Sequence, residues 1–245
     1  MNQPTSGTSR FSLGLIIFTA AITLATVPAG AQAGGELQQK LGAVKQSAAE
    51  NQQKLHQYQW TESTQLTLNG EPKPPTLSMC QYGPDGKVQK TPMGSPPQQQ
   101  AQGGGRLKQH IIEKKKEEMK DYMGQVKTLL AMYVPPDPQK MQQAFQAGKV
   151  SLNAGGGSGT AGIVFKDYAQ PGDQMTLSFN TAAKKISSIN VNTYMDNPKD
   201  IVTLAVQFAS LPDGTNYVQQ SVLDATAKKL KVTTTNSNYQ PVGSH

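Results

Sequence analysis

The residues that could transfer protons or bind a metal ion are few and far apart in this chain. Of its three histidines, His56 and His110 lie in segments with a folding pattern, and His245 is the last residue. His110 and Glu113 are one helical turn apart, but two ligands on a charged helix face do not complete a zinc site. We interpret this pair as solvated, so the sequence predicts no metal site.

The remaining catalytic candidates are equally isolated. Cys80 is the only cysteine and has no histidine beside it, while Asp196 and Asp200 lie in a turn, where Asp favours local hydrogen bonds. The chain has no Gly-x-Ser-x-Gly motif and no phosphate-binding glycine loop followed by Lys and Ser or Thr. The sequence therefore predicts no catalytic residues and no cofactor. A hydrolase that uses His110 or Cys80 is the remaining enzymatic alternative.

Residues 1–33 have the pattern of a cleavable signal peptide. Arg10 precedes an uncharged apolar run from Phe11 to Val27, which Pro28 interrupts, and Ala31-Gln32-Ala33 then supplies small residues at the cleavage site. An uncleaved membrane anchor is the alternative, because the run is close to the shortest helix that spans a bilayer. No later stretch reaches that length. We expect export to the periplasm or the medium, with residues 34–245 forming a single domain.

The charge of the chain does not indicate a nucleic-acid partner. The 23 Lys and Arg residues exceed the 16 Asp and Glu residues, giving a formal net charge of +7, but the excess is spread along the sequence. A nucleic-acid-binding surface needs basic residues gathered on one face. The densest group, Lys114-Lys115-Lys116, continues into Glu117-Glu118, a pattern typical of a solvated helix face.

Hydrophobic periodicity predicts two helical segments and many strands. The first part of the chain has a helix pattern, a switch to period two at Trp60, a Pro/Gly turn and a Pro/Gln/Gly-rich linker that we expect to be a flexible loop. Their ranges are 36–55 (helix), 58–69, 76–82 and 87–91 (strands), 83–86 (turn) and 92–105 (linker).

A long amphipathic helix is predicted over 106–133, followed by a short one. The apolar stripe of the long helix includes Leu107, Ile111 and Met119, and Pro135-Pro136 ends it. Asp137 is then a good N-cap with Pro138 in the first turn, which predicts a second helix to about 147.

The rest of the chain alternates apolar and polar residues in short strands joined by turns. This pattern predicts strands near 149–153, 161–168, 173–179, 186–195, 201–210, 216–223 and 230–239. A sheet with one apolar face must cover that face, and the predicted helices are the available cover. The fold class is therefore α+β, a large curved antiparallel sheet (an incomplete barrel), with an N-terminal helix and a helical insertion on its concave face.

The order of these elements resembles the LolA/LolB-like superfamily of lipoprotein carriers. The similarity lies in the N-terminal helix that leads into Tyr58-Gln59-Trp60, in the helical insertion at 106–147 and in the late strands around Leu177–Thr181, Lys185–Val191 and Val202–Phe208. The resemblance implies an incomplete barrel that helices close around an apolar cavity, which receives acyl chains. It rests on architecture, and no functional residue of the family is carried over.

In such an architecture the stripe of the long helix would face apolar strand residues across the cavity. Methionine adapts to irregular apolar ligands, which suits this role. The candidate lining residues are Met119, Tyr122, Met123, Val126, Leu130, Leu177, Phe179, Val191, Leu204 and Phe208. The same residues could instead form a filled core, since every α+β fold needs one.

Two functional hypotheses follow. The first is an exported, non-enzymatic carrier or sensor that binds a lipid or a lipoprotein acyl chain. The second is a protein-interaction or envelope-sensing module with a filled core, which contacts an envelope protein through its sheet or through the loop at 92–105.

Overall fold

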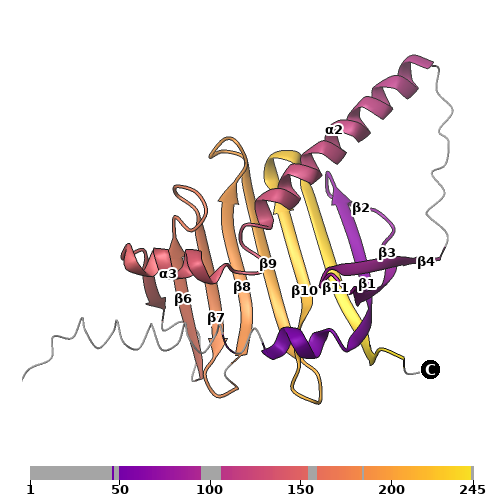
Figure 1. The fold of residues 1–245 in the computed structure, drawn as a ribbon. Coiled ribbons are helices and arrows are strands. Elements are labelled where there is room, and N and C mark those ends of the chain that lie inside the picture. Colours follow the sequence, from indigo (N-terminus) through magenta and orange to yellow (C-terminus); the bar gives the residue numbers. More distant parts are fainter. Residues whose placement is uncertain (1–45, 47–49, 95–105, 154–158, 184, 244–245) are drawn as a thin grey trace, which may run out of the picture.

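The structure is a computed structural model that describes residues 46, 50–94, 106–153, 159–183 and 185–243 (Figure 1). The predicted signal peptide, most of the predicted N-terminal helix and most of the predicted loop at 92–105 lie outside these ranges. Residues 50–55 are helical, in agreement with the end of the predicted helix.

One open antiparallel sheet organises the described part of the chain. Its strands follow the order β4-β3-β1-β11-β10-β9-β8-β7-β6-β5, and the short β2 pairs with β1. The two end strands, β4 and β5, do not pair with each other, so the sheet is an incomplete barrel, and the α+β prediction is confirmed. The strands are β1 (Tyr58–Leu68), β2 (Glu71–Pro72), β3 (Thr76–Tyr82), β4 (Val88–Met93), β5 (Val150–Asn153), β6 (Thr160–Lys166), β7 (Gln174–Asn180), β8 (Lys185–Tyr194), β9 (Ile201–Ser210), β10 (Asn216–Ala225) and β11 (Leu230–Pro241).

Alternation along the strands gives the sheet one apolar face. In β7 the side chains of Met175, Leu177 and Phe179 are buried, whereas their neighbours in the strand are at least partly exposed. The same period of two runs through β8 and β9. Because successive side chains point to opposite faces, each strand contributes its apolar residues to one side.

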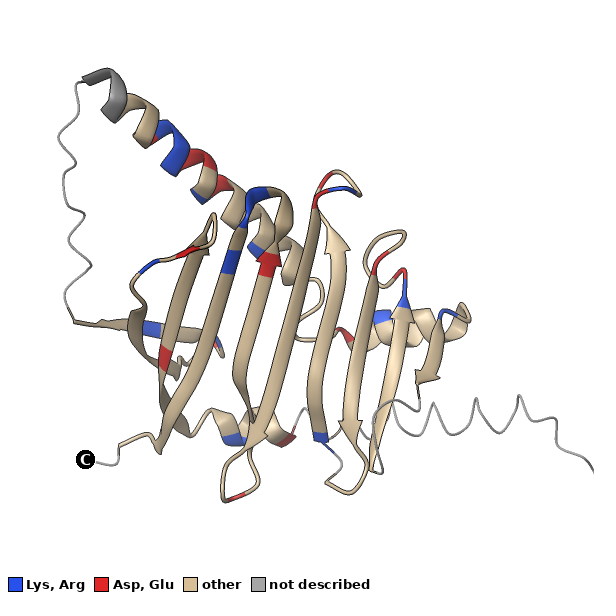
Figure 2. Ribbon diagram, turned by 180° about the vertical axis from the view of Figure 1, so that it is seen from behind, with Lys and Arg blue, Asp and Glu red and all other residues tan. Residues whose placement is uncertain are grey.

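The long helix and the short helix that follows it both lie on that apolar face. Figure 1 shows α2 (Arg106–Leu130) and α3 (Pro138–Gln146) in front of the strands, and Figure 2 shows the sheet from behind with the helices beyond it. The side chain of Asp137 accepts a hydrogen bond from the backbone N–H of Gln139 and caps α3, as predicted. The prediction that the long helix reaches residue 133 was wrong by three residues, because a turn follows Leu130.

The core lies between these helices and the sheet, and only part of α2 reaches it. Tyr122, Val126 and Leu129 of α2 are buried in the core cluster, whereas Ile111 is 51% exposed. The predicted apolar stripe was therefore wrong at Ile111. The helix extends past the sheet there, as Figure 1 shows.

The other end of the sheet curls toward the helices. Figures 1 and 2 both show β3 and β4 crossing the lower part of β1 on the helix side of the sheet. Pro92 lies within β4, at its exposed edge, where its missing N–H is tolerated. The predicted linker therefore begins too early, because Pro92 and Met93 still pair with Ser78 and Leu77.

Candidate functional site

The structure gathers the predicted lining residues on the helix-facing side of the sheet. All of them except Phe179 belong to one apolar cluster or pack against it. Phe179 is buried but lies outside that cluster. The buried members are Tyr122, Val126, Leu177, Val191 and Leu204, and the partly buried ones are Met119, Met123, Leu130 and Phe208.

The cluster is closely packed where α2 and α3 cover β6 to β9. Val126 on the helix and Leu177 and Val202 on the strands have no exposed surface. A side chain that lined an empty, water-sized space would retain accessible surface, so no such space adjoins these residues. Of the two alternatives for these residues, an open cavity or a filled core, the burial of Val126 and Leu177 favours the filled core.

A second part of the same face is only half-buried. Leu66 and Leu68 of β1 and Val232 of β11 are partly exposed and pack against the cluster. Met119 and Met123, on the middle turns of α2, are also partly exposed and pack against the cluster. Apolar side chains from the helix and from the sheet therefore border the core without being fully covered, and we call these residues the margin of the core.

A polar contact fixes α2 beside this margin. The hydroxyl of Tyr122 donates a hydrogen bond to Asp200 at 3.1 Å, and the Nζ of Lys228 lies 5.4 Å from the centre of the same ring. Burial, aided by the bond to Asp200, raises the pKa of Tyr122 to about 12. Sequence analysis assigned Asp200 only a local turn role, because nothing near it indicates a partner 78 residues away.

A buried carboxylate ties the end of α2 to the sheet. Asp173 is 2% exposed and accepts hydrogen bonds from the hydroxyl of Tyr133 at 2.5 Å and from the backbone N–H groups of Tyr168, Ala169 and Gln170 at 2.6–2.9 Å. The hydroxyl of Tyr133 also lies 2.8 Å from that of Thr193. Burial and the bond to Asp173 raise the pKa of Tyr133. Every donor in this network is satisfied, so it is structural.

An aromatic cluster occupies the curled end of the sheet. Tyr239 stacks on Trp60, with ring centres 5.4 Å apart and planes at 9°, and Tyr217 lies 4.4 Å from Tyr239. Tyr82 contacts Trp60 from β3. A bulge makes this stack, because Asn238 and Tyr239 of β11 lie opposite Trp60 alone and Asn238 has a φ of 55°. Sequence analysis missed the cluster, since a bulge shifts the alternation it relies on.

Cys80 lies on the neighbouring strand, opposite Trp60, and is free and fully buried. Burial raises the pKa of its thiol, so the thiol stays protonated at neutral pH and is a poor nucleophile. Glu62, on the same face of β1, pairs with Lys90 at 2.5 Å. The strand position predicted for Cys80 is confirmed, and its environment favours a structural role.

Among the described residues, no three of His, Cys, Asp and Glu lie close enough to bind a metal ion. His110 and Glu113 are both exposed on the part of α2 that extends past the sheet. Within the same described residues, no helix has the length and apolarity required to cross a membrane.

Comparison with known proteins gives structural similarity alone. No family model matches the chain, and no curated protein matches it in sequence. Among solved structures it is similar to a DUF1329 family protein from Desulfovibrio piger, with a TM-score of 0.38 and 9% identity over 85% of this chain and 94% of that one. It is also similar to a LolA superfamily protein from Nitrosomonas europaea, with a TM-score of 0.36 and 8% identity over 82% of this chain and 94% of that one.

Proposed function

We propose that this protein is an exported, non-enzymatic carrier or sensor that binds a lipid or lipoprotein acyl chain. The binding surface would be the half-buried apolar margin between α2 and strands β1 and β11. One observation supports the proposal above all: the apolar side chains on both sides of this margin, from α2 and from β1 and β11, are partly exposed where they pack against the buried core cluster.

The chemistry of the margin suits a flexible apolar chain. Met119 and Met123 have unbranched side chains that adjust to irregular ligands, and Leu66, Leu68 and Val232 offer an aliphatic floor. Each methylene group that leaves water on binding contributes about 0.8 kcal/mol. Four or five buried methylenes would therefore offset an appreciable part of the cost of ordering the ligand. A shift of α2 about Tyr122 would admit a longer segment.

The filled core favours the second hypothesis, a protein-interaction or envelope-sensing module. Val126 and Leu177 have no exposed surface, so an acyl chain cannot enter between them unless the core opens. In that case the exposed part of α2 or the sheet would contact an envelope protein, and the margin would be only the edge of the core.

Lipid binding is tested by native mass spectrometry of the protein purified without detergent, together with titration of a fluorescent fatty acid. We expect lipid adducts and saturable binding. A mass free of adducts, with no saturable signal from the probe, would exclude the carrier and leave the interaction module.

Two glutamine substitutions on α2, one at the margin and one at an exposed control position, test where the lipid binds. Met123→Gln introduces an amide at the margin and should weaken probe binding about tenfold or more, because an unpaired polar group would be desolvated. Ile111→Gln changes an exposed residue of the same helix and should leave the affinity unchanged. Equal effects of the two substitutions would contradict binding at the margin.

Export is a separate part of the proposal. Residues 1–33 should be removed, and the protein should fractionate with the periplasm or the medium. N-terminal sequencing of the secreted product checks this directly, and a product that retains Arg10 would contradict cleavage.

A further inference from the structure

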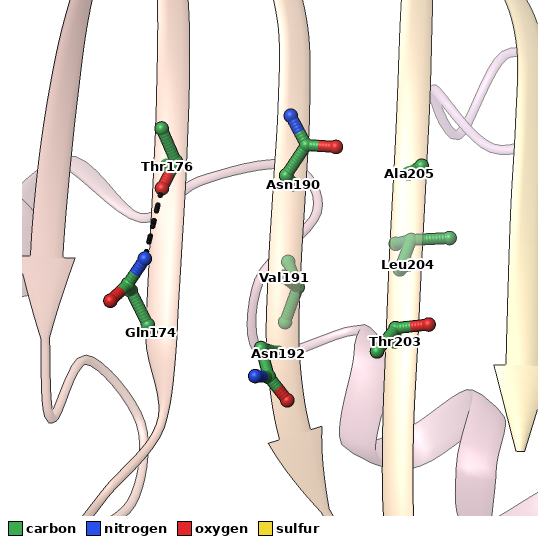
Figure 3. Close-up of a pocket in the computed structure, with 8 residues that line it drawn as sticks. All are labelled: Gln174, Thr176, Asn190, Val191, Asn192, Thr203, Leu204 and Ala205. Atoms are coloured by element: carbon green, nitrogen blue, oxygen red, sulfur yellow. Dashed lines mark hydrogen bonds between the residues drawn. The ribbon is translucent and has the colours of Figure 1, made fainter. Parts of the chain in front are cut away.

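A hollow lies on the opposite face of the sheet from the proposed lipid site. It has a volume of about 320 Å³ and spans the three adjacent strands β7, β8 and β9 (Figure 3). Its lining residues are Gln174, Thr176, Asn190, Val191, Asn192, Thr203, Leu204 and Ala205. The polar ones alternate with the buried core residues, so they belong to the face that α2 and α3 do not cover.

The polar groups around the hollow are available for a ligand. Asn190 and Asn192 come from β8, in the middle, between Gln174 and Thr176 on one side and Thr203 on the other. Within the described part of the chain, the side chains of Asn190, Asn192 and Thr203 have no hydrogen-bond partner in the protein. Gln174 and Thr176 share one long bond of 3.4 Å.

The three strands that form the hollow carry no charged side chain around it, and on the next strand, β10, Asp224 is opposite Thr203 and has Lys231 of β11 as its ion-pair partner. Figure 2 shows no Lys, Arg, Asp or Glu on the middle of these strands. A solvated strand face usually carries charged side chains, and Asn is disfavoured in strands, so two Asn residues side by side with Thr and Gln are an unusual choice. Asp224 and Lys231 already pair with each other, so a charged ligand would find no free counter-charge among the lining residues. An acyl chain would leave the amides unpaired.

We propose that this hollow binds a neutral saccharide. A sugar hydroxyl both donates and accepts a hydrogen bond, and each amide side chain offers two donors and one acceptor oxygen. The amides of Asn190 and Asn192 and the hydroxyl of Thr203 therefore match a ring with several hydroxyls. The volume is at the lower end for small-molecule sites and holds one sugar unit. The open, uncovered face of these strands lets the next units of a glycan extend along the sheet.

Saturation-transfer NMR on the full-length chain tests the proposal. The probes are maltotriose and triacetylchitotriose as neutral saccharides and trigalacturonate as an anionic control. We expect transfer to at least one neutral probe and a markedly weaker signal from the anionic one. No transfer to either neutral probe at millimolar concentration would overturn the proposal and leave a solvated face.

Substitutions on the exposed face separate binding from folding. Asn190→Ala should weaken binding about three- to tenfold, as the loss of one or two hydrogen bonds requires. Asn192→Lys should abolish binding, because it places a long side chain across the hollow. Gln220→Ala on β10 lies on the same face outside the hollow and should have no effect. Binding that survives Asn192→Lys in a folded protein would also overturn the proposal.

Discussion

The helix-facing side of the sheet is built in two different ways. In the β6–β9 region, aliphatic and aromatic side chains such as Ile163, Phe165 and Leu177 have no exposed surface beneath α2 and α3. In the region of the paired strands β1 and β11, the same face carries half-buried Leu66 at one end and an aromatic stack around Trp60 at the other. Between them lie polar residues, among which Asn236 accepts a hydrogen bond from the indole N–H of Trp60.

This difference shows that alternation of apolar and polar residues does not determine how deeply a strand is buried. β1 and β9 both have period two, yet Val202, Leu204 and Val206 are buried, whereas of the inward residues of β1 only Trp60 is. The depth of burial depends on the helices. The last turns of α2 cover strands β6 to β9, whereas β1 and β11 lie at the edge of that cover. Where the cover is incomplete, the apolar side chains stay partly exposed.

The largest expected effect is the loss of the buried carboxylate in the β6–β9 region. Asp173→Ala would leave the hydroxyl of Tyr133 and three backbone N–H groups without their acceptor, so we expect a loss of roughly 4 kcal/mol or more of unfolding free energy. Asn236→Ala in the β1–β11 region breaks two hydrogen bonds and should cost about 1–2 kcal/mol. Urea unfolding of both variants checks this order, with exposed Asp196→Asn as the control.

Matched leucine truncations sharpen the same comparison. Leu177→Ala should destabilise the protein by about 3 kcal/mol, because it leaves a cavity in a region without free space. Leu66→Ala should cost only about 1 kcal/mol, since that side chain is already half-exposed. Equal losses in thermal or urea unfolding would show that the two regions are equally well packed.

The bond between Tyr122 and Asp200 predicts a dependence on alkaline pH. Burial raises the pKa of Tyr122 to about 12 in the folded state, from 10.0, so its contribution is complete below pH 10 and is lost as pH rises from 10 to 12. Tyr122→Phe should cost about 1 kcal/mol at pH 7 and should reduce the slope of unfolding free energy against pH in that window. An unchanged slope would mean that the ring is solvated and α2 is not fixed there.

The smallest effect is expected at the exposed part of α2. Ile111→Lys should change the unfolding free energy by less than about 0.5 kcal/mol, because the side chain is 51% exposed. A larger loss in urea unfolding would indicate that this part of the helix packs against the protein in solution.

The regular elements could be predicted because local sequence determines them. The range of β9, 201–210, and the Asp137 cap of α3 depend on period and on one side chain. Asp173 and Asp200 could not be assigned their partners, since Tyr133 and Tyr122 meet them only after distant segments pack together. The same reasoning explains the candidate site: periodicity identifies its apolar residues but cannot tell a filled core from a margin.

The N-terminal part of α2 extends past the sheet, so a small rotation of the helix near Tyr122 produces a large displacement at its far end. At 1.5 Å per residue, about 24 Å of helix separates Arg106 from the contact of Tyr122 with Asp200. A tilt of about 10° at that contact shifts the backbone of Met119, three residues away, by less than about 1 Å but displaces the far end by roughly 4 Å. A partner that binds the N-terminal end of α2 would therefore act on the contact at Tyr122 from a distance. A spectroscopic label at this end would report movements that are too small to measure near the core.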